Sequence, residues 1–173
     1  MNIANKITFL RILMIPFFLF FMYRDVEYGN YIALGIFIVA SLTDMIDGFI
    51  ARKCNMITNL GKFLDPLADK ILVISAMIVF VEKGELASWA VIIIIFREFA
   101  ITGFRTIAAA NNNVIAASNW GKWKTVTQMA MIITLFFDFG NINYIKDILI
   151  YLTVAITLVS GLDYVRKNAH VIK

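Results

Sequence analysis

The 173-residue chain contains few charged residues, one cysteine, one histidine and two prolines. Only 16% of its residues are charged and 61% are hydrophobic, whereas soluble domains are about a quarter charged and about half apolar. This composition argues against a water-soluble globule and against a disordered chain. The single cysteine excludes an intramolecular disulfide, and nine glycines are too few for a collagen-like repeat. What remains is a small integral membrane protein.

Six stretches of mostly apolar residues are each long enough to cross a bilayer as a helix, which takes about 17 to 25 residues. They cover residues 10–24, 31–53, 66–82, 88–109, 119–139 and 144–165. The opening stretch, residues 1–11, is polar and mildly amphipathic, so we expect a short helix along the inner membrane interface. The sequence therefore predicts an all-α integral membrane protein. Residues 1–173 would form a single domain of six transmembrane helices with this short N-terminal interfacial helix.

Lys and Arg gather on alternate sides of these spans. Eleven of the sixteen lie in the N-terminal stretch, the second and fourth loops or the tail, whereas the other three loops hold three of them with six acidic residues. Positively charged loops stay in the cytoplasm, so we expect a multi-pass protein with both termini cytoplasmic. The net charge of +4 is therefore explained by the cytoplasmic bias of Lys and Arg in a membrane protein, and no nucleic-acid partner is expected.

Acidic residues inside the apolar spans are the strongest functional signal, because an ionised side chain there costs about 3 kcal/mol or more unless it is compensated. Asp44 and Asp47 are three residues apart, and Asp65 and Asp69 are four apart, so each pair shares a helix face. Both pairs lie toward the cytoplasmic ends of consecutive helices, where four carboxylates can converge. A fifth acid, Glu98, lies in the fourth span.

Four converging carboxylates repel one another and take up either protons or divalent cations. Carboxylate oxygens favour Mg²⁺ or Mn²⁺, and one cysteine with one histidine does not supply an ordinary zinc site. Four acids are enough for two cations, the arrangement that stabilises in-line displacement at phosphorus. We therefore predict two divalent cations, Mg²⁺ or Mn²⁺, as cofactors.

Some of these acids also have a purely structural explanation. Asp65 precedes Pro66, as in a helix N-cap followed by proline at the first helical position. Asp44 alone is explained by a buried hydrogen bond to a neighbouring hydroxyl. Glu98 has a possible ion-pair partner in Arg105, seven residues further on and on the same face.

The segment around the aspartates has a fixed spacing. It reads Asp44-Met-Ile-Asp47-Gly48-Phe-Ile-Ala51-Arg52, then eight residues, then Gly61-Lys-Phe-Leu-Asp65-Pro-Leu-Ala-Asp69. At all nine specified positions it resembles the DxxDGxxAR(x8)GxxxDxxxD signature of the CDP-alcohol phosphotransferases. The resemblance implies a six-helix membrane enzyme that transfers a phosphatidyl or related group from a CDP-linked donor to an alcohol and releases CMP. It also implies a homodimer.

The resemblance gives individual residues a role. Asp44, Asp47 and Asp65 would bind the metals, and Asp69 would complete the metal site and act as general base on the acceptor hydroxyl. The residues expected to bind the CDP-linked donor are Thr8, Asp44, Gly48, Ala51, Arg52 and Gly61. Taken alone, Gly48 and Ala51 equally suit close packing of helices. Arg52 equally suits an arginine that reaches the membrane interface, and Gly61 a helix cap.

A basic cluster predicts a phosphate-bearing acceptor. Arg105 ends the fourth predicted helix, and Lys122 and Lys124 open the fifth. The bias of cations toward the cytoplasmic side explains the same residues without a ligand.

Three further segments, residues 5–11, 97–105 and 121–125, are similar to bacterial family members that use CDP-diacylglycerol and glycerol 3-phosphate. This likeness covers residue 2 to about residue 128. It adds Arg11 to the predicted acceptor-phosphate residues. It implies transfer to the C1 hydroxyl of glycerol 3-phosphate by an enzyme of the bacterial plasma membrane, in contact with membrane lipid.

Other functions remain open at this point. One alternative is a member of the same family with inositol phosphate, serine or phosphatidylglycerol as acceptor, and competition between acceptors distinguishes these. A cation-coupled transporter would also carry carboxylates inside the membrane, but it leaves the fixed Gly, Ala and Arg positions unexplained. A structural membrane scaffold would show neither transport nor release of CMP.

Overall fold

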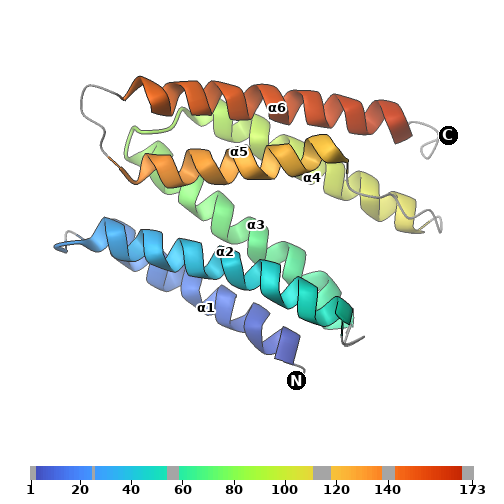
Figure 1. The fold of residues 1–173 in the computed structure, drawn as a ribbon, viewed down its shortest axis with the longest axis horizontal. Coiled ribbons are helices and arrows are strands. Elements are labelled where there is room, and N and C mark those ends of the chain that lie inside the picture. Colours follow the sequence, from blue (N-terminus) through green and yellow to red (C-terminus); the bar gives the residue numbers. More distant parts are fainter. Residues whose placement is uncertain (1–2, 25, 54–58, 111–117, 138–142, 169–173) are drawn as a thin grey trace. The chain divides into compact units, whose positions relative to one another are not determined.

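The computed structural model describes residues 3–24, 26–53, 59–110, 118–137 and 143–168, without the side chains of residues 3–8, 44–53, 59–66, 69 and 110. The regular structure of the described residues is entirely α-helical (Figure 1). The helices are α1 Ile3–Tyr23, α2 Gly29–Lys53, α3 Asn59–Glu82, α4 Ser88–Ala110, α5 Asn119–Leu135 and α6 Tyr144–Asn168. The predicted all-α class is confirmed for this part of the chain, with a helix at each of the expected positions.

The polar N-terminal stretch is not a separate element. α1 runs without interruption from Ile3 to Tyr23 and contains Pro16. The expectation of a separate interfacial helix before the first span is therefore wrong. No glycine or proline lies between Ile3 and Arg11, so nothing in this stretch breaks the helix before the apolar residues begin.

α3 begins at Asn59, so Asp65 and Pro66 lie inside the helix. The alternative in which Asp65 is an N-cap is therefore wrong. Pro66 predicts either a helix start or a bend, of which the helix start is wrong and the bend stays a prediction. The first turns of α3 are polar, and a search for apolar runs does not detect a helix that begins with polar residues. α5 differs in the other direction, because it ends at Leu135 with Phe136 as its C-cap rather than at residue 139.

The chain divides into two compact units, Met1–Val79 and Phe80–Lys173. In the first unit α1 packs along α2. Phe18 of α1 and Phe37 of α2 are fully buried, and their ring centroids lie 6.2 Å apart. This aromatic contact lies in the apolar part of both helices.

In the second unit α4 and α5 both pack against α6. The Thr153 hydroxyl of α6 donates a hydrogen bond to the Thr127 carbonyl of α5, at 3.2 Å. Near the start of α6, Lys146 Nζ donates to Glu85 Oε2 at 2.6 Å and so connects α6 to the turn before α4. Buried apolar side chains of this unit include Ile94, Met131, Ile132, Leu135 and Val154.

Within the described residues, one helix is long and apolar enough to cross a membrane by length and composition, α6. Two shorter apolar helical stretches, Phe9–Tyr23 and Gly29–Thr43, lie in α1 and α2. α4 combines its apolar residues with a charged pair at its centre, Arg97 and Glu98. The surroundings of this charged pair form a polar site in the second unit.

Candidate functional site

The predicted metal-binding and donor-binding residues are found on the first three helices. α2 carries Asp44, Asp47, Gly48, Ala51 and Arg52 in its C-terminal part, and α3 carries Gly61, Asp65 and Asp69 in its N-terminal half. Their side chains, and that of Thr8 on α1, are outside the described set. Because both segments are helical, the spacing puts the two aspartates of each pair on a shared face. Convergence of the two pairs stays a prediction.

The second unit contains a cavity of about 250 Å³, which we call the polar cavity. It lies where the C-terminal half of α4, the start of α5 and the end of α6 meet. Among the residues that the structure describes, three cations and one carboxylate line it, so this lining carries an excess of positive charge. The lining residues are Arg97, Glu98, Ile101, Arg105, Ser118, Gly121, Lys122, Thr125 and Tyr164.

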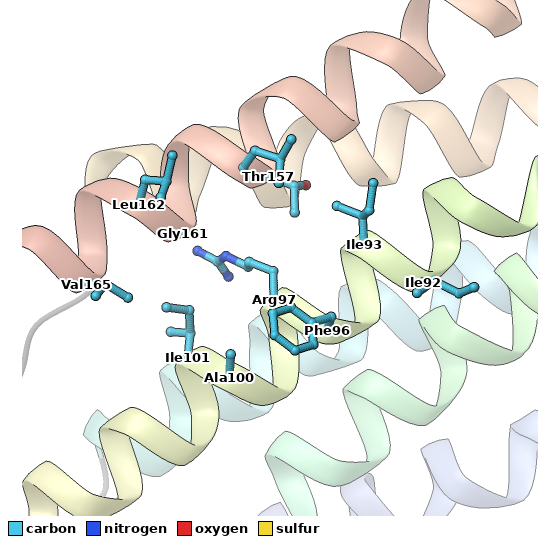
Figure 2. Close-up of a pocket in the computed structure, with 11 residues that line it drawn as sticks. Ile92, Ile93, Phe96, Arg97, Ala100, Ile101, Thr157, Gly161, Leu162 and Val165 are labelled. Carbon is cyan, nitrogen blue, oxygen red and sulfur yellow. The ribbon is translucent and has the colours of Figure 1, made fainter.

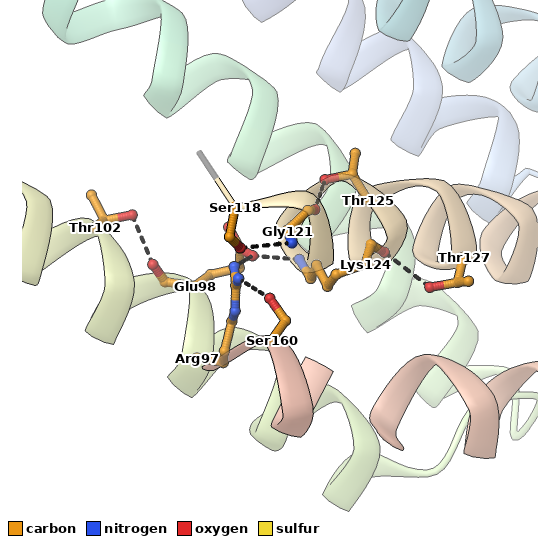
Figure 3. A network of polar contacts seen from close by, with 9 residues as sticks. All are labelled: Arg97, Glu98, Thr102, Ser118, Gly121, Lys124, Thr125, Thr127 and Ser160. Carbon is orange, nitrogen blue, oxygen red and sulfur yellow. Dashed lines mark hydrogen bonds and ion pairs between the residues drawn. The ribbon is translucent and has the colours of Figure 1, made fainter. Parts of the chain in front are cut away.

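Glu98 binds two cations at the wall of the polar cavity (Figure 3). Arg97 Nη1 donates to Glu98 Oε1 at 3.0 Å, and the Lys124 ammonium donates to the same oxygen. Lys124 is only 4% exposed, so its charge is buried and Glu98 neutralises it. The structural explanation of Glu98 was an ion pair with Arg105, and the ion pairs that the structure shows for Glu98 are with Lys124 and Arg97.

Arg97 is also held by α6. Its Nη2 donates a hydrogen bond to the Ser160 hydroxyl. The next residue, Gly161, leaves room for the arginine stem, because a Cβ there would lie 3.2 Å from Arg97 Cγ. Arg97 lines the polar cavity and also an apolar cavity of about 400 Å³ between α4 and α6 (Figure 2). It is therefore a charged residue at a boundary between apolar and polar space.

The start of α5 is fixed by a helix cap. Ser118 is the N-cap, and its side-chain oxygen accepts a hydrogen bond from the Gly121 backbone N–H at 3.1 Å. A Cβ at Gly121 would lie 3.4 Å from this oxygen and 3.9 Å from Arg97 Nη2. The cap therefore positions the first turn of α5, which carries Lys122, beside the arginine.

The structure brings together two of the four predicted acceptor residues, Arg105 and Lys122, in one cavity. Lys124 lies in the adjoining wall, bound to Glu98. Arg11 is buried on α1, in the first unit. The sequence reasoning did not assign Arg97 or Tyr164 to this site.

One of the two missed residues had a signal in the sequence. The signal for Arg97 is a charged residue within an apolar run. In the sequence this criterion was applied to acidic residues alone. Tyr164 lies at the end of the sixth apolar span, where tyrosine is typical of an ordinary anchor at the membrane interface, so its type and position do not indicate a role in a site.

The comparison with known proteins agrees with the signature of the aspartates. The family model described as CDP-alcohol phosphatidyltransferase matches residues 1–159, from α1 into α6 and across both compact units. The chain belongs to the CDP-alcohol phosphatidyltransferase family.

Relatives within this family cover almost the whole chain. A Bacillus subtilis protein named CDP-diacylglycerol–glycerol-3-phosphate 3-phosphatidyltransferase is 40% identical over 99% of this chain and 97% of its own. A Haemophilus influenzae protein of the same name is 37% identical over 95% of this chain and 92% of its own. A Mycobacterium tuberculosis protein named probable phosphatidylglycerophosphate synthase is 36% identical over 96% and 81%, respectively. The similarity to these bacterial proteins therefore includes the helices that line the polar cavity.

Proposed function

We propose that this chain transfers the phosphatidyl group of CDP-diacylglycerol to the C1 hydroxyl of glycerol 3-phosphate, giving phosphatidylglycerol phosphate and CMP. The observation that carries this proposal is the polar cavity, where Arg97, Arg105 and Lys122 surround a space and Glu98 is the one carboxylate among the described lining residues. Positive charge that is partly withdrawn from water is stabilised by an anionic ligand. The names of the near-full-length relatives favour glycerol 3-phosphate as that anion.

The cations in the polar cavity and its adjoining wall divide into two groups by their existing partners. Lys124 and one side of Arg97 are bound to Glu98, so their charge is already compensated in part. Arg105 and Lys122 are the groups that we assign to the acceptor phosphate, with arginine able to bind two phosphate oxygens at once. An acceptor without a phosphate, such as serine, would leave this charge without a partner.

Two divalent cations, Mg²⁺ or Mn²⁺, are part of the proposal. Asp44, Asp47, Asp65 and Asp69 offer carboxylate oxygens from two consecutive helices, a set of donors that fits these ions. When bound, the cations would neutralise the donor diphosphate and the charge that develops on CMP.

Side chains of the protein carry out the proton transfer and bind the nucleotide. Asp69 takes the proton from the C1 hydroxyl of the acceptor. The resulting oxygen attacks the phosphorus attached to diacylglycerol, a new P–O bond forms, and the bond from that phosphorus to CMP breaks. Gly48, Ala51 and Gly61 would let the nucleotide approach the helices closely, while Thr8 and Arg52 would bind it.

The membrane arrangement that fits this reaction is a multi-pass protein of the bacterial plasma membrane with both termini in the cytoplasm. Glycerol 3-phosphate is water-soluble, whereas the donor is a lipid, so the site must lie near the membrane surface. The assembly that we propose, on the family likeness, is a homodimer.

The direct test uses protein purified in detergent, supplied with CDP-diacylglycerol and Mg²⁺ or Mn²⁺. Parallel reactions receive glycerol 3-phosphate, inositol phosphate or serine, and mass spectrometry follows CMP and the lipid products. We expect CMP and phosphatidylglycerol phosphate with glycerol 3-phosphate alone, and no turnover after chelation until a divalent cation is returned. CMP with a different acceptor would overturn the acceptor, and folded protein that releases no CMP with any acceptor would overturn the reaction.

A single substitution tests the role of Asp69. Asp69→Asn should abolish turnover and leave binding of CDP-diacylglycerol largely intact, because the amide cannot accept the proton. The matched control is Asp163→Asn on α6. The Asp163 carboxylate pairs with the exposed Lys167, so this substitution should leave activity unchanged. Normal activity of the Asp69→Asn protein would contradict the assignment of the general base.

A further inference from the structure

Tyr164 is a buried tyrosine in the wall of the polar cavity. It lies near the C-terminal end of α6 and is 3% exposed. Its hydroxyl has no hydrogen-bond partner among the described residues, although the side chain lines the cavity. A buried hydroxyl without a hydrogen-bond partner lowers the stability of the folded protein, so this hydroxyl does not stabilise the protein without ligand.

The ring of Tyr164 is held in place by its neighbours. Phe104 of α4 meets it edge to face, with ring centroids 5.8 Å apart and planes at 84°. Such a contact needs the ring and not the hydroxyl, so phenylalanine would pack here as well. The hydroxyl is therefore positioned by a contact in which it takes no part.

The charges around Tyr164 determine what approaches its hydroxyl. Arg105 and Arg97 line the same cavity as the Tyr164 side chain. An anion attracted by these guanidinium groups would bring acceptor oxygens into reach of the hydroxyl. Hydrogen bonds to a charged acceptor are the stronger ones, so a phosphate would supply the missing partner.

We infer that the Tyr164 hydroxyl binds the acceptor by donating a hydrogen bond to its phosphate, so that α6 takes part in acceptor recognition. The inference rests on the proposed function, because it assigns the phosphate of the acceptor to the polar cavity. It adds a neutral donor from a third helix to the cations of α4 and α5. A neutral donor contributes direction to the binding of an anion without adding further charge to the site.

The test is Tyr164→Phe, with Tyr151→Phe as a matched control on the same helix. Tyr151 is 64% exposed and contacts Trp89 through its ring, at 5.9 Å between centroids. For Tyr164→Phe we expect the KM for glycerol 3-phosphate to rise about 10-fold or more, with kcat and the KM for CDP-diacylglycerol unchanged. The thermal unfolding midpoint without substrate should stay the same or rise, because no hydrogen bond of the free protein is lost. The control should match the wild type in all four values.

Three results would overturn the inference. One is an unchanged KM for glycerol 3-phosphate in the Tyr164→Phe protein. The second is a rise confined to the KM for CDP-diacylglycerol, which would assign the hydroxyl to the donor. The third is a lower unfolding midpoint with all kinetic constants affected, which would make the hydroxyl structural. Wild-type protein that gives no product from glycerol 3-phosphate would instead overturn the proposed function, so the two failures are distinguishable.

Discussion

A single carboxylate compensates two cations in the interior of the second unit. Glu98 Oε1 accepts from both Arg97 and Lys124, and the side chains of these cations are 12% and 5% exposed. Such an arrangement adds little net stability compared with an apolar core, but removing one partner leaves a buried charge uncompensated. Glu98 is therefore expected to position the basic residues at the wall of the cavity as well as to permit their burial.

Glu98→Gln should lower the free energy of unfolding by about 2 kcal/mol or more, because Lys124 and Arg97 lose their counter-charge. Lys124→Met should also destabilise the protein. The double variant should lose less than the sum of the two, since it removes both members of the pair. Denaturation of the detergent-purified proteins measures these free energies of unfolding. Asp163→Asn, which breaks the exposed pair with Lys167, is the control and should cost less than about 0.5 kcal/mol. Strictly additive losses would show that Glu98 and Lys124 are not coupled.

At the scale of helices, α4 and α6 depend on a glycine where they meet. A Cβ at Gly161 would lie 3.2 Å from Arg97 Cγ, and Arg97 has little freedom to move because Ser160 and Glu98 hold its guanidinium. Gly103 on α4 has nothing within 4 Å of the corresponding position. The two glycines therefore respond differently to the same substitution.

We predict that Gly161→Ala lowers the unfolding midpoint, whereas Gly103→Ala leaves it unchanged or raises it. Alanine favours a helix over glycine by about 0.5–1 kcal/mol, and at Gly103 this gain meets no steric cost. At Gly161 the gain is offset by displacement of Arg97. Activity should therefore fall in the Gly161→Ala protein, through a higher KM for the acceptor. Equal shifts in both variants would mean that Arg97 adapts without cost.

Helix positions could be predicted from the sequence where apolar residues extend to the ends of the helix. Residues 88–109 were expected and α4 covers Ser88–Ala110, because both boundaries coincide with a change in polarity. The start of α3 was missed because its first turns are polar. The pairing of Glu98 with Lys124 was missed for another reason. Lys124 lies 26 residues away on another helix, and helical periodicity relates residues within one helix only.

At the scale of the whole chain, the distribution of Lys and Arg assigns each helix end of the second unit to one side of a membrane, and ends assigned to the same side lie together. The end of α4, the start of α5 and the end of α6 share the polar cavity, and all three were assigned to the cytoplasmic side. The start of α6 meets the turn before α4 through Lys146 and Glu85, both assigned to the outer side. Successive helices of this unit therefore run in alternating directions, and the side of the membrane that each helix end faces stays a prediction.

The same topology predicts which side of the membrane each loop occupies. Cys54 follows α2 and should react with a membrane-impermeant thiol reagent in inside-out vesicles but not in right-side-out vesicles. Glu27→Cys in a Cys54→Ser background lies between α1 and α2 and should give the opposite pattern. Solubilised protein, in which both positions should react, is the control. Labelling of both positions from the same side would mean that α2 does not cross the bilayer, and the paired aspartates on α2 and α3 would then need a different explanation.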